Sequence, residues 1–403
     1  MLHNYTEEVV EVLEEQKITG YIGFDPTAPS LTIGNYIQIM ILHFFQKAGH
    51  TPIVLMGGAT GRIGDPSFKD TERDLKTFEE LDKNLAHQQQ QFERLLDFTS
   101  IDNRARLVNN LDFYQNMNVL DFLRDVGKSL NVSYMLAKDS VKTRLEKGLS
   151  FTEFSYQLLQ GYDFQLLYSQ ENCILQMGGS DQWGNITSGT EFIRKNLGAK
   201  AFAITTPLLT KSDGSKFGKS AEGNIWLDPK LTSPYKFYQF WINADDNDLS
   251  KYLRYFSFRN REEIEKLEKD FEDDLQSLKK VLAEEMTVRI HSQEAFEAVL
   301  KVSELLFNRN SDRDFLGTLR LHDWEAVEGT FDENKEVINL LTEATNITPS
   351  KGDARRAIKG NAISINKVKV SSFDHEIVRA ELFLGNYLLV ENGKKNKFVV
   401  KVL

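Results

Sequence analysis

The chain has 403 residues, of which 41% are hydrophobic and 27% charged, a composition typical of a globular protein with two or three domains. Its single cysteine, Cys173, excludes an internal disulfide, and no CxxC or HExxH spacing is present to hold zinc. No apolar run approaches the roughly 20 residues of a membrane span, and five glutamates among the first 17 residues argue against a signal or transit peptide. We therefore expect a cytoplasmic protein without a protein-liganded metal.

The net charge of −10 is unevenly distributed along the chain. From Ser350 to the C-terminus, 11 Lys and Arg stand against 5 Asp and Glu, a local balance of +6 that leaves the first 349 residues at −16. Such a basic end is either a solvated, lysine-rich surface or a contact surface for nucleic acid. Charge alone does not decide between these two interpretations.

The N-terminal half alternates short apolar runs with amphipathic stretches. The apolar runs predict strands at 18–24, 51–57, 173–177 and 201–209, and residues 35–48 have helical periodicity. This alternation predicts an α/β fold with a parallel sheet. In such sheets ligands bind beyond the carboxyl ends of the strands, so we expect the loops 23–35, 57–67 and 178–185 to converge on one crevice.

The second half of the chain has a different pattern. Helical, highly charged sequence begins at about residue 225 and continues to about residue 317. An acidic connection covers 318–336, and the compact segment 337–403 returns to short strands, AISIN and KFVVKVL, around the basic cluster. We expect a helical domain, a linker and a small α+β domain.

Two of the loops and one later segment have features of a phosphate or nucleotide site. In GFDPTAPSLTIGN, Gly34 lies at the start of the predicted helix, where unpaired N–H groups favour phosphate, and in GGSDQWGN, Asp181 is able to accept from ribose hydroxyls. The segment GSKFGKS has one residue too few between its glycines for a P-loop. Each signal alone is also compatible with an ordinary turn, and their occurrence on one sheet edge favours a nucleotide site.

Taken together, GFDPTAPSLTIGN, GGATGRIGDPS, LLQGYDF, GGSDQWGN, KFGKS and IWLDPKLTSPYKFYQFWIN resemble the bacterial-type tyrosyl-tRNA synthetases, which are class I enzymes. The ending SKGDARRAIKGNAISINKVKV resembles an S4-type RNA-binding domain. The resemblance implies a Rossmann-type catalytic domain at 1–224 with an inserted helical segment at about 112–165. It further implies an α-helical anticodon-binding domain at 225–317, a linker at 318–336 and an S4-like domain at 337–403.

The resemblance implies that tyrosine and ATP react to tyrosyl-adenylate and pyrophosphate, and that tyrosine then passes to the 3′ end of tRNA(Tyr). KFGKS looks like this family's form of the KMSKS loop, so Lys216 and Lys219 would neutralise the departing pyrophosphate. Lys69 and Arg73 would reach the pyrophosphate from another loop. Magnesium would enter with ATP and not through dedicated protein ligands.

The resemblance also implies how tyrosine is recognised. Tyr21 and Asp163 would pair with the phenol hydroxyl, so that phenylalanine leaves both unpaired and is rejected without editing, as the tyrosyl enzyme is known to do. The remaining tyrosine-binding positions hold the ammonium, orient this cluster or lie near the reacting carboxyl group: Asp65, Asn110, Tyr156, Gln160 and Gln182. Tyr156, Gln160 and Asp163 are spaced so that one helix face presents all three.

The ATP-binding positions implied by the resemblance are Asp25, Thr27, Gly34, Gly179, Asp181, Gln182, Lys219 and Ser220. One departure concerns the family signature His-x-Gly-His, which here reads Thr32-Ile33-Gly34-Asn35. Asn35 keeps a donor, whereas Thr32 is shorter and never carries charge, so we expect weaker phosphate stabilisation. We nevertheless expect an active enzyme in which Thr32 and Asn35 take the catalytic positions of the histidines.

The resemblance implies two macromolecular partners, tRNA(Tyr) and a second copy of the chain in a homodimer. The RNA-binding candidates lie in the basic segment: Lys351, Arg355, Arg356, Lys359, Lys367 and Lys369. Two alternatives remain open at this point. One is a catalytically inactive, RNA-binding or regulatory paralogue; only the TIGN signature supports it, and the retention of the other site residues argues against it. The other is a tryptophanyl enzyme, which the pairing of Tyr21 with Asp163 and the S4-like end disfavour.

Overall fold

A computed structural model describes residues 2–67, 76–145, 148–220, 223–307, 326–329, 336–378, 381–382, 387–393 and 396–402. The chain divides into two compact units. The first unit consists of Met1–Leu227 and Asp245–Ile264, and the second of Asp228–Ala244 and Glu265–Leu403. None of the helices formed by the described residues is long and apolar enough to cross a bilayer.

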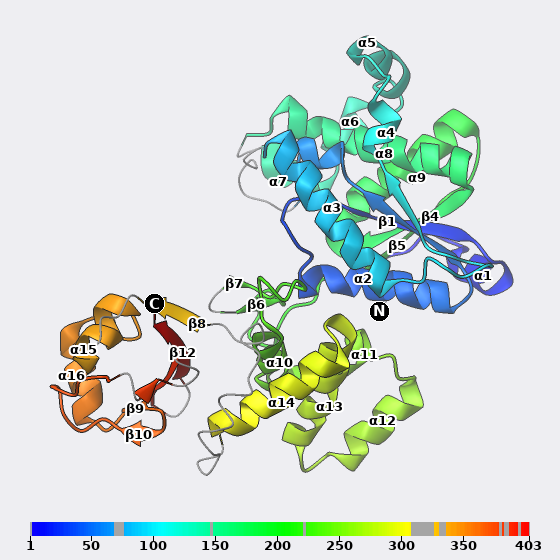
Figure 1. Cartoon of the computed structure of the whole chain (residues 1–403). Helices are drawn as coiled ribbons and strands as arrows, with labels where there is room; N and C mark the ends of the chain where they lie inside the picture. The colour runs from blue at the N-terminus through cyan, green and yellow to red at the C-terminus, as the bar shows by residue number, and fades with distance from the viewer. Residues whose placement is uncertain are drawn as a thin grey trace. The chain divides into compact units, whose positions relative to one another are not determined.

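The first unit is built on a five-stranded parallel sheet in the order β3-β2-β1-β4-β5 (Figure 1). The strands are β1 (Thr19–Phe24), β2 (Thr51–Met56), β3 (Arg106–Asn109), β4 (Cys173–Gly179) and β5 (Phe202–Thr206). The predicted α/β fold with a parallel sheet is confirmed, and β3 is a strand that the sequence pattern did not predict. The strand order reverses between β1 and β4, which is where such sheets bind ligands.

Helices cover both faces of this sheet. The crossover connections place α2 (Ile33–Lys47) and α3 (Phe78–Leu95) on one face, and α8 (Phe151–Glu171) and α9 (Trp183–Leu197) on the other. The alternation of side chains along β1 agrees with this arrangement, because Tyr21 packs against Phe164 of α8 and Phe24 packs against Phe92 of α3. The sheet is therefore buried on both faces.

Short elements complete the first unit. Between β3 and α8 the chain forms α4 (Leu111–Tyr114), α5 (Val119–Asp121), η2 (Phe122–Val126), α6 (Val132–Leu136) and α7 (Asp139–Leu145). The others are α1 (Val9–Glu15), η1 (Thr60–Arg62), η3 (Ser180–Gln182), β6 (Lys219–Ser220), β7 (Gly223–Asn224), α11 (Asp246–Phe256) and the start of α12 (Arg261–Asp270). Thus α11 belongs to the first unit, although it follows α10 (Pro234–Ile242) of the second.

The second unit contains helices α10, α13 (Leu275–Ile290) and α14 (Gln293–Phe307) and a C-terminal sheet in the order β10-β9-β11-β12-β8. Its strands are β8 (Ala326–Gly329), β9 (Ile363–Ile365), β10 (Val368–Lys369), β11 (Tyr387–Asn392) and β12 (Asn396–Val402). All pairs are antiparallel except β12 with β8. Strand β8 lies within the range expected to be a linker.

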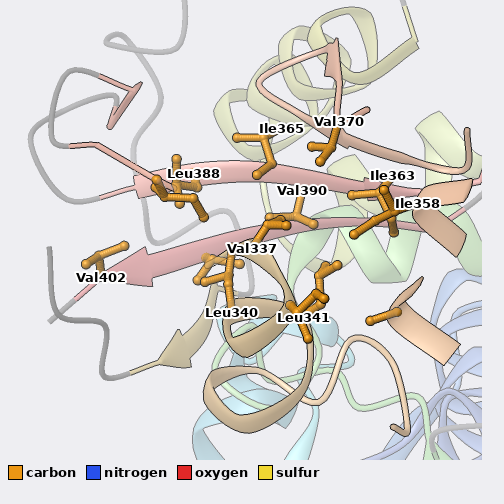
Figure 2. Close-up of a cluster of buried hydrophobic side chains, with 14 residues drawn as sticks. Val337, Leu340, Leu341, Ile358, Ile363, Ile365, Val370, Leu388, Val390 and Val402 are labelled. Carbon is orange, nitrogen blue, oxygen red and sulfur yellow. The ribbon is translucent and has the colours of Figure 1, made fainter. Parts of the chain in front are cut away.

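The C-terminal sheet has a core of its own, shown in Figure 2. The helical segments α15 (Val337–Asn339), η6 (Leu340–Ala344) and α16 (Lys351–Lys359) pack on the sheet through Val337, Leu341 and Ile358, among others. These apolar side chains meet Leu388 and Val390 of β11. Each such side chain contributes roughly 1.5–3 kcal/mol when fully buried. The small α+β fold expected at the C-terminus is confirmed.

Candidate active site

A cavity of about 450 Å³ opens at the carboxyl ends of β1, β2 and β4. Of the residues expected to bind tyrosine or ATP, or to act in catalysis, those that line it are Tyr21, Asp25, Thr27, Thr32, Gly34, Asn35, Asp65, Asn110, Tyr156, Gln160, Asp163, Gly179, Asp181 and Gln182. The loops that follow β1, β2 and β4 therefore converge, together with one face of α8, on a single crevice.

Asp163 is the buried carboxylate of this cavity, with 1% of its surface exposed. Its Oδ2 accepts from Asn110 Nδ2 at 2.9 Å, and its Oδ1 accepts from the Tyr114 hydroxyl at 2.7 Å. Burial raises the pKa of Asp163 to about 7, and the hydrogen bonds from Tyr114 and Asn110 oppose this rise. Burial and protein donors thus act in opposite directions on this carboxyl group.

Five residues that line the cavity each have a buried side-chain oxygen with no hydrogen-bond partner among the described residues: Tyr21, Gln38, Gln88, Gln160 and Gln176. Burial, with the nearby charge of Asp163 as a second cause, raises the pKa of Tyr21, so the phenol keeps its proton. An unsatisfied buried donor or acceptor costs about 1–3 kcal/mol. A polar ligand with both donors and acceptors would relieve this cost.

A chain of hydrogen bonds links Asp163 to the loops after β1 and β2. Asn110 Nδ2 also donates to Thr60 Oγ1 at 3.0 Å, and Thr60 donates to Asp25 Oδ1 at 2.7 Å. The Tyr156 hydroxyl donates to Asp25 Oδ2 at 2.9 Å. A side-chain carbon at Gly57 would lie 2.0 Å from Asp25 Oδ1, so only glycine fits beside this carboxylate.

A second polar cluster surrounds Asp65. Its Oδ2 accepts from Gln182 Nε2 at 2.8 Å, and its Oδ1 accepts from Asn185 Nδ2 at 3.3 Å and from the Ser67 amide at 3.0 Å. Burial, followed by the charge of Asp65, raises the pKa of Asp181 at the same edge of the cavity. Two carboxylates on one wall favour a ligand that brings a positive charge or hydroxyl donors.

Thr32 and Asn35 form a reciprocal cap at the start of α2. The Asn35 amide donates to Thr32 Oγ1 at 3.3 Å, and the Thr32 amide and hydroxyl both donate to Asn35 Oδ1, at 2.9 and 2.8 Å. Their side chains therefore bond mainly to each other. The side-chain Nδ2 of Asn35 keeps its two protons for a ligand. The hydroxyl proton of Thr32 is already donated to Asn35 Oδ1.

The KFGKS segment lies beside the start of α2, and its last two residues form β6, which pairs antiparallel with β7. Phe217 anchors it, with ring centroids 5.1 Å from Tyr252 and 5.2 Å from Phe256 of α11. Gly218 has φ +81°, and a side-chain carbon there would lie 3.0 Å from Ile33 Cγ2. Lys216 and Lys219 are exposed.

Several expected site residues lie elsewhere. Lys216 and Lys219 do not line the cavity; Lys69, Arg73 and the side chain of Ser220 fall outside the part of the chain that the structure describes. Lys211, for which no role was expected, donates to the Lys219 carbonyl at 2.8 Å.

Among the residues that line or support the cavity and were not predicted from the sequence are Thr60, Tyr114 and Gln176. Gln176 had a recognisable signal, since it is a polar residue within the buried apolar run of β4. Tyr114 follows Asn110 by one helical turn, but nothing in the local pattern indicates that it meets α8. Thr60 lies in the glycine-rich loop 57–67, which was predicted to line the crevice without a separate role for Thr60.

The RNA-binding candidates lie on α16 and next to β9 and β10. Arg355, Arg356, Lys359 and Lys369 are exposed, and Lys351 forms an ion pair with Glu343 at 2.7 Å. Arg356 pairs with Asp353. Burial lowers the pKa of Lys367. Within the described part of the chain, Arg355, Lys359 and Lys369 have no carboxylate partner and remain open to phosphate.

Comparison with known proteins agrees with this geometry. The family model for tRNA synthetases class I (W and Y) matches residues 13–308, and that for the Tyrosine--tRNA ligase SYY-like C-terminal domain matches 322–400. The Tyrosine--tRNA ligase of Cytophaga hutchinsonii is 51% identical over 100% of this chain and 97% of its own length. That of Bacteroides thetaiotaomicron is 47% identical over 99% and 97%.

Among solved structures, a C-terminally truncated mitochondrial tyrosyl-tRNA synthetase of Aspergillus nidulans matches with a TM-score of 0.69 and 29% identity, covering 76% of this chain and 91% of that one. A tryptophanyl-tRNA synthetase of Plasmodium falciparum has 12% identity and a TM-score of 0.50 over 71% and 78%, which reflects a shared fold only. The full-length similarity to Tyrosine--tRNA ligases and the match to their C-terminal domain disfavour the tryptophanyl alternative. The chain belongs to the tyrosine--tRNA ligase family of the class I tRNA synthetases.

Proposed function

We propose that the chain activates tyrosine with ATP and transfers it to tRNA(Tyr). A tyrosine carboxylate oxygen attacks the α-phosphorus of ATP and pyrophosphate leaves, giving tyrosyl-adenylate. A hydroxyl of the tRNA 3′ end then attacks the carbonyl carbon and AMP leaves. No covalent enzyme intermediate is needed, so positioning and charge compensation carry the catalysis.

The observation that carries this proposal is the match between the buried polar atoms and tyrosine. The substrate phenol would donate to Asp163 and accept from Tyr21, whose hydroxyl has no partner among the described residues. Gln160 Oε1 and Gln176 Oε1, buried and likewise unpartnered within the described residues, would accept from the ammonium group. We also assign Asp65 and Tyr156, which both line the cavity, to the ammonium group of the substrate tyrosine.

For ATP, we propose that its adenosine lies along Thr27, Gly179 and Asp181, and its phosphates near the start of α2. The backbone amide of Gly34 at the N-terminus of α2, together with the helix dipole, favours negative charge. Lys216 and Lys219 would have to swing from exposed positions to reach the pyrophosphate, joined by Lys69 and Arg73. We propose that magnesium arrives bound to ATP, because Mg²⁺ in such sites is commonly held by substrate phosphates and few carboxylates.

We further propose a cytoplasmic homodimer. Its support is a set of exposed apolar side chains on α5 and η2, where Val119, Leu120 and Leu123 are 68%, 72% and 48% exposed. Contiguous exposed apolar side chains mark association surfaces. Leu120→Asp should convert a dimer into monomers in light scattering coupled to gel filtration, whereas a wild-type monomer would refute the proposal.

The domain roles follow from the same assignment. We propose that residues 1–224 perform the chemistry, that 225–317 read the anticodon arm, and that 337–403 add backbone contacts to tRNA. Exposed Arg355, Lys359 and Lys369 support the last role.

The deciding experiment is amino-acid-dependent exchange of pyrophosphate into ATP, with tyrosine, phenylalanine and tryptophan offered separately. Exchange with tyrosine alone is the expected result. It would also establish that Thr32 and Asn35 suffice in place of histidines. No exchange from folded protein would favour the RNA-binding paralogue.

A further inference from the structure

Tyr114 makes a contact that the assignment of the pocket does not use. Its hydroxyl lies 2.7 Å from Asp163 Oδ1 and 3.1 Å from the Leu159 carbonyl. A hydroxyl has a single proton, and the shorter contact to an ionised acceptor takes it when Asp163 is charged. Since Asn110 donates to the other oxygen, both oxygens of Asp163 are held by protein donors.

The ring of Tyr114 is fixed independently of its hydroxyl. It packs against Phe122 and Tyr162, with centroid distances of 6.4 and 6.1 Å. Tyr114 does not itself line the cavity. Its hydroxyl therefore acts on the substrate only through Asp163.

The state of Asp163 decides what the pocket accepts. An ionised carboxylate accepts the proton of a substrate phenol, and leaving that carboxylate unpaired is costly, which excludes phenylalanine. A protonated Asp163 is cheaper to leave unpaired. Burial pushes Asp163 toward the protonated form, and the hydrogen bond from Tyr114 works in the opposite direction.

We propose that Tyr114 is a specificity-determining positioning residue, whose hydroxyl keeps Asp163 ionised and aimed at the phenol of the substrate. This inference rests on the proposed assignment of Asp163 to the tyrosine hydroxyl. Tyr114 would thus contribute to the choice of amino acid without contacting either tyrosine or ATP.

The test compares Tyr114→Phe with Tyr162→Phe in the full-length protein. The control removes a hydroxyl from the neighbouring ring, and that hydroxyl has no hydrogen bond within the described part of the chain. Pyrophosphate exchange gives kcat/KM for tyrosine and for phenylalanine between pH 6 and pH 8.5.

For Tyr114→Phe we expect kcat/KM for tyrosine to fall about tenfold at pH 7 and the acid-side midpoint of its pH profile to rise by about one pH unit. The value for phenylalanine should stay constant or rise, so the tyrosine-to-phenylalanine ratio falls about tenfold. Tyr162→Phe should match the wild type in all three readouts. In an Asp163→Asn background, Tyr114→Phe should have no further effect on the ratio.

Equal losses for both amino acids with an unmoved pH midpoint would overturn the proposal, because they indicate a purely structural role. The same changes in Tyr162→Phe would overturn it as well, since the effect would not depend on the hydrogen bond. Failure of the proposed function is a separate outcome, in which the wild-type protein itself shows no exchange with tyrosine.

Discussion

Replacing Tyr21 with phenylalanine should make the free protein more stable and the enzyme less active. The side chain is fully buried, and its ring lies against Phe164 with a centroid distance of 5.3 Å, a contact that phenylalanine keeps. Only the hydroxyl is lost, and within the described part of the chain that hydroxyl has no hydrogen-bond partner. Stability and activity should therefore change in opposite directions.

The magnitudes follow from the hydrogen-bond inventory. Removing an unsatisfied buried hydroxyl relieves part of a desolvation penalty of about 1–3 kcal/mol, so the free energy of unfolding of the unliganded protein should rise by about 1 kcal/mol. Bound tyrosine loses one neutral hydrogen bond worth about 0.5–1.5 kcal/mol, which weakens binding roughly 2- to 13-fold. Phenylalanine, which makes no such bond, should bind equally well or better.

Two measurements on the same preparation check this reasoning. Denaturant unfolding without ligand gives the stability change, and pyrophosphate exchange at varied tyrosine gives the change in kcat/KM. Adding saturating tyrosine should raise the melting temperature of the variant less than that of the wild type. If Tyr21→Phe destabilised the unliganded protein by 1 kcal/mol or more, its hydroxyl would have a partner in the free pocket and the argument would fail.

Three further predictions concern other parts of the chain. Thr32→His should raise the rate of tyrosine activation while lowering the free energy of unfolding by about 1 kcal/mol through loss of the α2 cap. Thr32→Ser is the control, because serine keeps the cap. An unchanged or lower activation rate in Thr32→His would refute the idea that Thr32 limits activation. Burial lowers the pKa of His291 to about 4, so the unfolded chain, with an ordinary value of about 6.5, takes up this proton first as pH falls. Stability should then fall between pH 6.5 and pH 4 by up to about 3 kcal/mol, and His291→Leu should show a smaller fall in denaturant unfolding at pH 7 and pH 4.5. The double variant Arg355→Ala, Lys359→Ala should reduce the slope of log affinity for tRNA against log salt concentration by about 2. The control, Lys47→Ala in the first unit, should leave the slope unchanged. An unchanged slope in the double variant would mean that neither Arg355 nor Lys359 contacts a phosphate.

The sequence predicted most reliably those elements whose burial is one-sided or complete. The strands β1, β2, β4 and β5 carry near-continuous apolar runs because both faces of the sheet are covered. Strand β3 escaped prediction because it has only four residues, none of them fully buried, and begins with Arg106. Likewise, β8 has no pattern of its own and becomes a strand only by pairing with β12.

In the candidate site, too, local relations could be predicted from the sequence and long-range contacts could not. Spacing along one helix placed Tyr156, Gln160 and Asp163 on one face of α8, since that relation is local. The contact of Tyr114 with Asp163 joins residues 49 positions apart, and no local pattern reports on it. The mutual cap of Thr32 and Asn35 is a local feature, because threonine followed three residues later by a side chain that can return a hydrogen bond is a pattern for the start of a helix.

The carboxylate of Asp25 has a consequence for how the two substrates influence each other. It accepts from Tyr156, assigned to the ammonium end, and from Thr60, which leads through Asn110 to the phenol end. Asp25 itself lines the cavity, and the family resemblance places it among the expected ATP-binding residues. A nucleotide that fixes Asp25 would thereby order both ends of the amino-acid pocket. Thermodynamic reciprocity then requires that tyrosine tighten ATP binding by the same factor by which ATP tightens tyrosine binding.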